Sequence, residues 1–224
     1  MDKYSLLTDA YFGTGLFENG AGLRQHPRED PANYKDRQGL AYYLNYTGPI
    51  VNAAVDPIFK NDIKRDYNGS TLFQAFLDDC DRTGTDYQDF CKSAALQAKL
   101  YGVAYIVVDN SDELAERRSD AVAGRKLPFL KIITPAQIKN WAIDRYGRLT
   151  MFQYTETSQV GANAKNTETY TWTQDSWAIG NGDGKTTGNH NIGCVPVVQW
   201  LARNTGRKII KPPSEYLSVA QANY

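Results

Sequence analysis

A helix followed directly by a buried strand, over residues 85–109, constrains the fold more than any other part of the sequence. Thr85 is a good N-cap residue, because its side-chain oxygen can accept a hydrogen bond from a first-turn amide, and Gln88 completes a capping-box pattern. Gly102 follows the last turn, where glycine adopts the left-handed conformation at low cost. Residues 103–108 (VAYIVV) carry no charge and lead into Asp109, as a buried strand should. We expect this unit to form the centre of the domain.

The predicted helix has one apolar face that is partly made of small residues. Apolar side chains recur there at helical spacing, at Tyr87, Phe90, Cys91, Ala94, Ala98 and Tyr101. The alanines are small enough to let another backbone lie close. We therefore expect this face to be packed.

Composition excludes several classes of protein. Hydrophobic residues make up 42% of the chain and charged residues 22%, which is typical of a globular protein. Basic and acidic residues both total 25, so the chain lacks the basic excess of a nonspecific nucleic-acid binder. We expect no secretion signal and no membrane helix, since no stretch approaches about 20 apolar residues. The three cysteines, Cys80, Cys91 and Cys194, are widely spaced and are expected to be reduced.

The order of patterns predicts an α+β fold, in which a helical N-terminal half packs on a mixed or antiparallel sheet. Residues 1–35 are glycine-rich and are interpreted as an extended N-terminal arm, residues 36–211 as one α/β domain, and residues 212–224 as the start of a following helix that is truncated. Helices are predicted from Asp36 to Thr47, from Pro49 to Ile58, from Thr71 to Asp79 after an Asn68–Gly69 turn and a Ser70 cap, and over residues 134–141 with Thr134 as cap. Strands are predicted over residues 127–133, 149–155, 168–172 and 194–201, with hairpin connectors at 156–167 and 180–191. The charged residues 111–126 are predicted to be a solvated loop or a short exposed helix.

Two loops resemble ligand-binding motifs without completing them. Residues 79–84 (DCDRTG) have the oxygen side chains and sixth-position glycine of a calcium loop, but Phe90 stands at the twelfth position, where a glutamate is needed. Residues 180–186 (GNGDGKT) resemble a phosphate loop, but the glycine spacing is short and no helix follows. A helix-to-helix turn and a hairpin tip are the better interpretations.

No catalytic, cofactor-binding or metal-binding residue is assigned from the sequence. The histidines, His26 and His190, both lie in polar loops, and no Cys/His cluster or Ser-His-Asp pattern is apparent. Asp78, Asp79, Asp81 and Asp109 could gather a magnesium ion, as in nucleases. Their spacing favours helix ends and strand ends instead.

Seven segments, in their order and spacing, resemble the portal proteins of tailed bacteriophages. They are residues 37–46 (RQGLAYYLNY), 52–59 (NAAVDPIF), 76–85 (FLDDCDRTGT), 97–109 (QAKLYGVAYIVVD), 128–141 (PFLKIITPAQIKNW), 192–200 (IGCVPVVQW) and 212–217 (PPSEYL). The resemblance spans residues 35–224, and it corresponds to the wing, the peripheral α/β part of a portal subunit.

The resemblance implies a structural protein that is not an enzyme and needs no cofactor. Portals are homo-oligomeric rings, usually dodecamers, at one capsid vertex through which DNA is packaged and ejected. Implied partners are the terminase, the major capsid protein, the head-tail adaptor and the double-stranded DNA in the channel, with no membrane. The implied location is the virion, and the host cytoplasm during assembly. Another phage head or tail component, such as an adaptor or head-completion protein, and a metal-dependent nuclease remain as alternatives.

In a ring, the arm has a further expected role. Its apolar residues, Tyr11, Phe12, Leu16, Phe17 and Leu23, show no periodicity, so we expect them to pack on a neighbouring subunit. A disordered leader is the alternative.

Overall fold

The protein has the predicted α+β fold. The computed structural model describes residues 2–110, 117, 119–120, 127–159, 165–181, 184–203 and 210–222. Within them, most helices lie in the first half of the chain, and the strands form two sheets that are both antiparallel. The charged segment predicted at 111–126 lies almost entirely outside the described residues.

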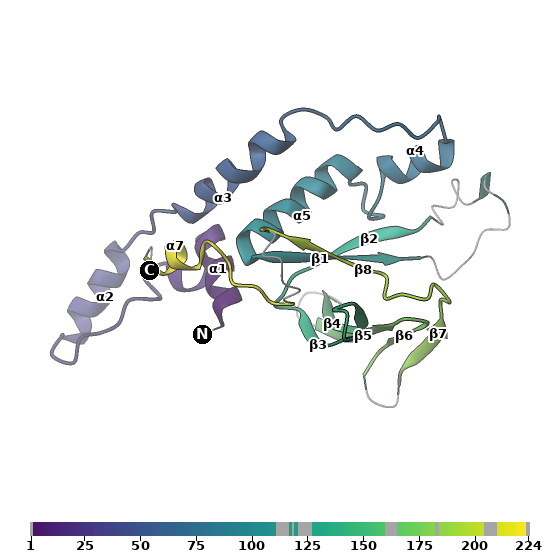
Figure 1. Cartoon of the computed structure of the whole chain (residues 1–224). Helices are drawn as coiled ribbons and strands as arrows, with labels where there is room; N and C mark the ends of the chain where they lie inside the picture. Colours follow the sequence, from purple (N-terminus) through teal and green to yellow (C-terminus); the bar gives the residue numbers. More distant parts are fainter. Residues whose placement is uncertain are drawn as a thin grey trace.

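The helices form a row of short elements that leads to one long helix. They are α1 (Lys3–Phe12), the 3-10 turn η1 (Gly15–Phe17), α2 (Pro31–Leu40), α3 (Thr47–Val55), the 3-10 turn η2 (Asp56–Phe59), α4 (Thr71–Asp78), α5 (Tyr87–Tyr101) and α7 (Leu217–Ala222). In Figure 1, α3 and α4 lie along α5, whereas α2 lies apart at one end of the molecule.

The strands form a three-stranded and a five-stranded sheet. The first sheet has the order β2-β1-β8 and the second the order β3-β4-β5-β6-β7. Their bounds are Val103–Asp109 (β1), Phe129–Ile133 (β2), Ile138–Ile143 (β3), Leu149–Gln159 (β4), Lys165–Thr173 (β5), Ser176–Ile179 (β6), Thr186–Asn189 (β7) and Val197–Leu201 (β8). In the register of the first sheet, Ile106 of β1 is paired with Ile132 of β2 on one side and with Val198 of β8 on the other.

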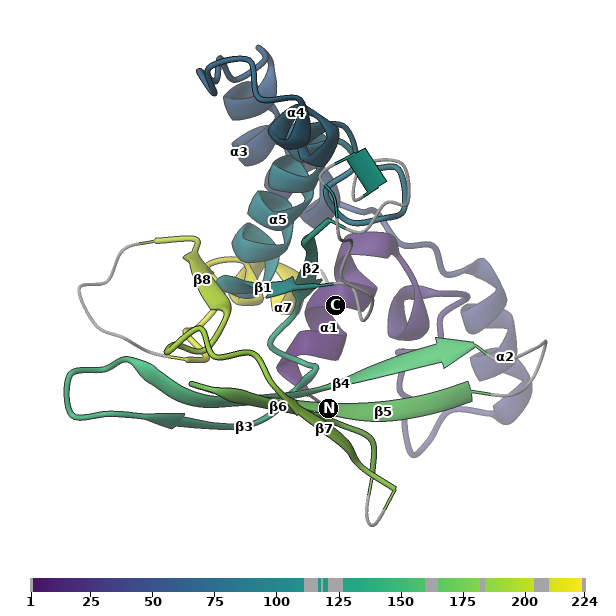
Figure 2. The same cartoon turned by 90° about the vertical axis from the view of Figure 1, so that its right-hand side faces the viewer.

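The domain has three layers, with the first sheet in the middle. The helix α5 covers one face of this sheet, and the second sheet lies against the other face (Figures 1 and 2). Because side chains alternate along a strand, Tyr105 and Val107 of β1 lie on the face toward the second sheet. The ring centroids of Tyr105 and Phe152 are 5.0 Å apart there. On the helix side, Phe90 packs with Leu130. The unit predicted at the centre of the domain therefore contributes to the core on both faces of the sheet.

The N-terminal segment is a folded part of the domain, so its interpretation as an extended arm is wrong. Residues 3–12 form α1, and Leu7 and Ala10 are fully buried in a second core cluster with Val51 of α3, Leu100 of α5 and Ala220 of α7. Tyr11, Leu16 and Phe17, which were expected on a neighbouring subunit, also pack in this cluster. These three residues are therefore covered within the chain, in a cluster that includes α7 from the other end of the sequence, whereas Phe12 is exposed.

The two ends of α5 differ in how well they were predicted. Gly102 is left-handed, with φ 91°, and its amide donates to the carbonyl oxygen of Ala98, as expected of a C-cap. The N-cap is Asp86 and not Thr85, because the Asp86 carboxylate accepts from the amide of Asp89. Gln88 donates instead to the carbonyl oxygen of Asn61, so the capping box does not form.

Two further predictions are wrong. The helix from Asp36 starts earlier, at Pro31, and ends at Leu40, after which residues 41–46 belong to no helix or strand. The helix predicted over 134–141 is instead a turn followed by β3, because the side chain of Gln137 accepts from the Thr134 amide and residues 138–143 pair with β4.

The strands β6 and β7 were not predicted. The strand β7 occupies part of the expected connector 180–191, and β4 and β5 shorten the connector 156–167. The Ser70 cap and the Asn68–Gly69 turn are confirmed.

The small face of α5 gives a first test of the packing. Ala98 is 1% exposed and lies in the face predicted to be packed. Ala98→Leu is expected to lower the free energy of unfolding by about 1–3 kcal/mol, because the extra atoms force neighbours apart. Urea denaturation of the two proteins measures the difference. Unchanged or increased stability would mean that position 98 is not packed.

Candidate functional site

The four aspartates that could have gathered a magnesium ion are used separately in the fold. Asp79 accepts from the amide of Gly84 at 2.9 Å, and Asp81 accepts from the amide of Thr83 at 2.8 Å. Asp78 lies at the end of α4, where it accepts from Gln74, and Asp109 ends β1, where it lies 4.0 Å from the ammonium of Lys131. Within the described part of the chain, no group of three or more His, Cys, Asp or Glu residues could hold a metal ion.

Asp81 organises the turn between α4 and α5. Its carboxylate accepts from the Thr83 hydroxyl at 2.7 Å and from the Thr85 amide at 3.2 Å, in addition to the Thr83 amide. Burial raises the pKa of Asp81, but the hydrogen bonds from Thr85 and Thr83 outweigh burial and hold this pKa below its ordinary value. The calcium-like pattern of this loop is therefore explained by turn formation.

The role of Asp81 gives a prediction that separates a turn from a metal site. Asp81→Asn is expected to lower the free energy of unfolding by about 1 kcal/mol, since charged acceptors make the stronger hydrogen bonds. Because the folded-state pKa is depressed, the contribution is complete above the ordinary pKa of about 3.9 and is lost as the pH falls through the folded-state value. Thermal unfolding at pH 7 and pH 3 measures both effects. A fall in the melting temperature of several degrees in EDTA would instead indicate a bound metal.

A groove of about 420 Å³ lies between this turn, β2 and β4. It is lined by Asp81, Thr83, Thr85, Phe90, Ser93, Leu130, Lys131, Ile132 and Glu156. Lys131 is its one basic group, and the Lys131 ammonium lies 3.1 Å from the Glu156 carboxylate and 4.8 Å from the Tyr170 ring centre. The charge of Lys131 is thus shared between the carboxylates of Glu156 and Asp109.

Lys131 links the two sheets at this groove. Lys131 belongs to β2 of the first sheet, whereas Glu156 and Tyr170 belong to β4 and β5 of the second. Burial, and then repulsion by Glu156 and Glu168, raises the pKa of Tyr170, so this phenol stays neutral. In the lining, Asp81, Thr83 and Thr85 bind one another within the turn, and Lys131 binds Glu156. Lys131 was not predicted as a site residue; its signal in the sequence is a single charge within the apolar run of residues 127–133.

The histidines and the glycine-rich loop lie elsewhere. His190 contacts the carbonyl oxygen of Thr173 at 3.1 Å and packs beside Trp172, while His26 accepts from the Arg28 amide. Gly180 and residues 184–188 belong to the β6–β7 hairpin, which confirms the predicted hairpin; residues 182–183 lie outside the described part.

The cysteines differ in burial. Cys80 and Cys91 are buried and Cys194 is exposed, and burial, followed by the charge of Asp81, raises the pKa of Cys80 to about 12. Burial also raises the pKa of Cys91. We expect a thiol reagent at pH 8 to label one cysteine rapidly in the folded protein and all three after unfolding. Cys194→Ser should abolish the rapid phase; rapid labelling of two thiols would contradict this assignment.

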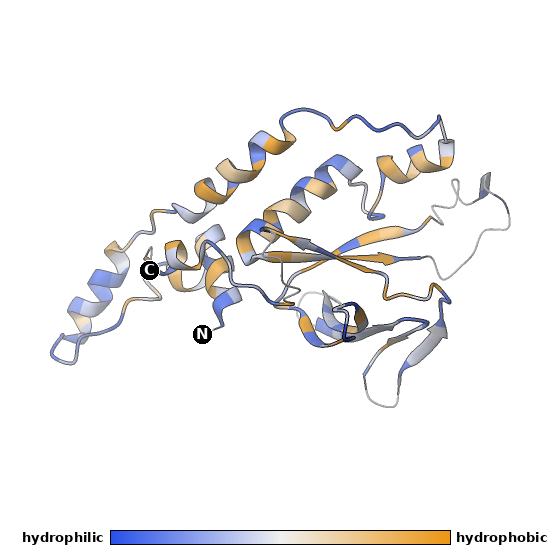
Figure 3. Ribbon diagram, viewed as in Figure 1, coloured by the Kyte–Doolittle hydropathy of each residue, from blue (hydrophilic) through white to orange (hydrophobic). Residues whose placement is uncertain are grey.

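The most unusual surface of the molecule is apolar. The exposed large apolar side chains include Leu40, Tyr42, Leu44, Tyr46 and Ile50, which come from the end of α2, the connecting segment 41–46 and the start of α3. We call these five residues the apolar row. Figure 3 shows hydrophobic residues along this part of the ribbon. A contiguous exposed apolar surface can mark a site that binds another macromolecule.

No described helix is both long enough and apolar enough to cross a membrane. Comparison with known proteins identifies no family for this chain, since no protein-family model and no curated protein matches it.

Proposed function

We propose that this chain is the peripheral wing part of a portal subunit, a structural component of a ring at the capsid vertex of a tailed phage. The ring is a homo-oligomer, a dodecamer as in the family that the sequence resembles, and DNA enters and leaves the capsid through it. Its partners are the terminase, the major capsid protein and the head-tail adaptor. The chain works in the virion, after assembly in the host cytoplasm, without catalysis, cofactor or metal.

The placement of the portal-like segments is the observation that carries this proposal. Three of them, residues 97–109, 128–141 and 192–200, are far apart in the sequence but meet in the first sheet as β1, β2 and β8. The segment 212–217 then reaches the end of α5, where the Ser214 hydroxyl donates to the carbonyl oxygen of Leu100 at 2.6 Å. The portal-like segments, which were selected for their order and spacing in the sequence, thus pack together in one part of the fold.

The surface gives independent support. The apolar row is exposed in the isolated chain, which suits a subunit whose surface is covered in an assembly. The net charge of zero suits a peripheral wing better than the lining of a DNA channel, which would be expected to attract phosphates. The aspartates needed for a nuclease are engaged in turns and ion pairs.

Electron microscopy of the natural gene product that contains this chain tests the proposal. The expected result is closed rings with a central channel, unaffected by EDTA. A uniform population of monomers, or DNA cleavage that depends on added magnesium, would reject it. A variant with Asp79 and Asp81 both replaced by asparagine should still form rings, because neither side chain is assigned to assembly.

A further inference from the structure

The side chain of Lys211 is held at the edge of the second sheet, between aromatic rings. Its ammonium donates to the carbonyl oxygen of Ile138, at the start of β3, at 3.1 Å. The same ammonium lies 5.6 Å from the ring centre of Trp141 and 5.9 Å from that of Tyr4. The strand β3 is an edge strand, and Trp141 is 37% exposed. A fixed cation thus stands beside an accessible indole ring.

Two further lysines crowd Lys211 without neutralising it. Burial lowers the pKa of Lys211, and repulsion by Lys3 and Lys139 lowers it further, whereas the charge of Asp2 raises it. Among the residues that the structure describes, none of the three lysines forms an ion pair with a carboxylate. An anion bound at this point would relieve the repulsion between them.

A second basic group lies at the other end of β3, in the turn to β4. The guanidinium groups of Arg145 and Arg148 lie 4.7 Å and 5.7 Å from the ring centre of Tyr146, which is 63% exposed. The carboxylate of Asp144 accepts from the backbone amides of Tyr146 and Arg148, at 2.8 Å in both cases. In the described part of the chain, neither arginine is ion-paired. The turn therefore presents two cations around an exposed aromatic ring.

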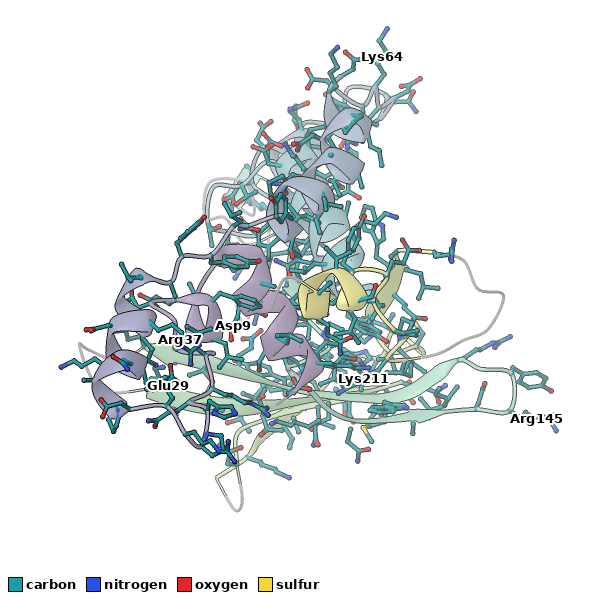
Figure 4. The ribbon with its side chains drawn as sticks, turned by 90° about the vertical axis from the view of Figure 1, so that its left-hand side faces the viewer. Asp9, Glu29, Arg37, Lys64, Arg145 and Lys211 are labelled. Carbon is teal, nitrogen blue, oxygen red and sulfur yellow. The ribbon has the colours of Figure 1, made fainter. Side chains whose placement is uncertain are left out.

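The strand β3 joins the two basic groups into one surface, which we call the basic stripe. Figure 4 shows Lys211 beside this strand and Arg145 at the tip of the β3–β4 hairpin. Residues 139–145 extend over about 20 Å at the rise of a strand. The segments that form the stripe, residues 2–4, 138–148 and 211, hold five basic and two acidic residues, although the whole chain is neutral. These are Lys3, Lys139, Arg145, Arg148 and Lys211 against Asp2 and Asp144.

We propose that the basic stripe binds a single-stranded nucleic acid, with phosphates on its lysines and arginines and a base stacked on Trp141. Unpaired bases stack on aromatic side chains while their phosphates follow a positively charged surface, and the stripe offers both features side by side. In a duplex the base faces are covered by stacking, and an acidic peptide has no base, so both would use the cations alone. The proposal goes beyond the proposed ring and does not depend on it.

The salt dependence of binding tests the role of the cations. We expect a fluorescein-labelled oligothymidylate of about 15 nucleotides to bind the whole chain in fluorescence anisotropy. Each neutralised phosphate of a single strand contributes about −0.7 to the slope of log K against log salt, so five cations give about −3.5. Replacing Arg145 and Arg148 together by glutamine should change the slope to about −2.1.

The matched control removes the same charge from the far end of the molecule. Lys60 and Lys64 are both exposed, and Figure 4 shows Lys64 far from Arg145. Replacing Lys60 and Lys64 together by glutamine should leave the affinity and the slope unchanged. A loss equal to that of the arginine pair would indicate attraction by overall charge and overturn the assignment to the stripe.

The role of Trp141 is tested by a change that leaves the charge intact. Trp141→Ala should weaken binding about 5- to 150-fold without altering the salt slope, because it removes stacking alone. Trp141→Phe should keep most of the affinity, and it should also abolish the quenching of tryptophan fluorescence that the oligothymidylate causes in the unchanged protein. Circular dichroism of both variants checks that they are folded. Quenching that persists in Trp141→Phe would show that no base stacks on Trp141, and would overturn the proposal.

Two other polyanions distinguish the proposed ligand from the alternatives. A DNA duplex and an oligoglutamate of the same length should each bind more weakly than the oligothymidylate, and neither should respond to Trp141→Ala. Equal affinity for the duplex would indicate a site for double-stranded DNA, and equal affinity for the oligoglutamate a site for acidic proteins. Either result, or the absence of oligothymidylate binding at low salt, would overturn the proposal and leave the proposed ring untouched.

Discussion

Replacing Leu7 by alanine will lower the free energy of unfolding by about 2–5 kcal/mol, because the change leaves a cavity in a packed core. Leu7 is fully buried in the cluster formed by α1, α3, α5 and α7. A stability loss of this size is a large part of the total for an ordinary domain. Urea denaturation at 25 °C, followed by fluorescence of the four tryptophans, measures it.

The matched control for this variant lies on the same helix. Phe12, at the end of α1, is exposed, so Phe12→Ala should change the free energy of unfolding by no more than about 0.5 kcal/mol. Both variants remove a large apolar side chain from the N-terminal segment, but only one removes it from a core. If Leu7→Ala were as mild as Phe12→Ala, the segment would be the loosely attached arm that the sequence suggested, and α1 would not be part of the domain.

The N-terminal segment shows why one part of the fold could not be predicted from the sequence. The apolar face of α1 contains Tyr4, Leu7 and Ala10 at helical spacing, but the glycines that follow at 13, 15, 20 and 22 dominate the local pattern. Its partners are α3, α5 and α7, and α7 lies about 200 residues further along the chain. A segment whose partner is so remote carries no local signal that its apolar residues are covered.

The helix α5 and the strand β1 were predictable because their signals are local. A left-handed glycine, a run of six uncharged residues and an apolar helical face all lie within 25 residues. The N-cap was displaced by one position because Thr85 and Asp86 are both good caps. In the structure the Thr85 hydroxyl lies 3.3 Å from that of Thr83, and the Asp86 carboxylate accepts from the first-turn amide of Asp89.

The segment 134–141 and the groove around Lys131 could not be predicted, because their structure depends on contacts between distant strands. The Thr134–Pro135 pattern fits a helix start and a tight turn equally well, and the pairing of β3 with β4 selects the turn. The groove around Lys131 combines side chains of β2, β4 and the α4–α5 turn, so its geometry depends on how two sheets stack. Sequence patterns predict which residues are strand-like, but they do not place two strands of different sheets side by side.

Gly102→Ala is the other change with a large expected effect, because two separate costs fall on one residue. At φ 91° an alanine is in the left-handed region, which costs about 1–2 kcal/mol. A Cβ atom at this position would also lie 2.8 Å from the carbonyl oxygen of Pro213 and 3.1 Å from that of Pro212. Both atoms belong to the backbone, so the segment that leads to α7 would have to move. The expected loss is about 3 kcal/mol or more.

Gly84→Ala isolates the first of these costs. Gly84 has nearly the same φ, 92°, but no atom lies within 4 Å of the Cβ that alanine would add. This variant should therefore lose only about 1–2 kcal/mol in the same urea titration. The difference between the two variants measures the close approach of residues 212–213 to the end of α5, a contact between the portal-like segments 97–109 and 212–217. Equal losses would mean that the backbone at 212–213 does not lie against Gly102, and the packing of α7 on α1 would then have to be revised.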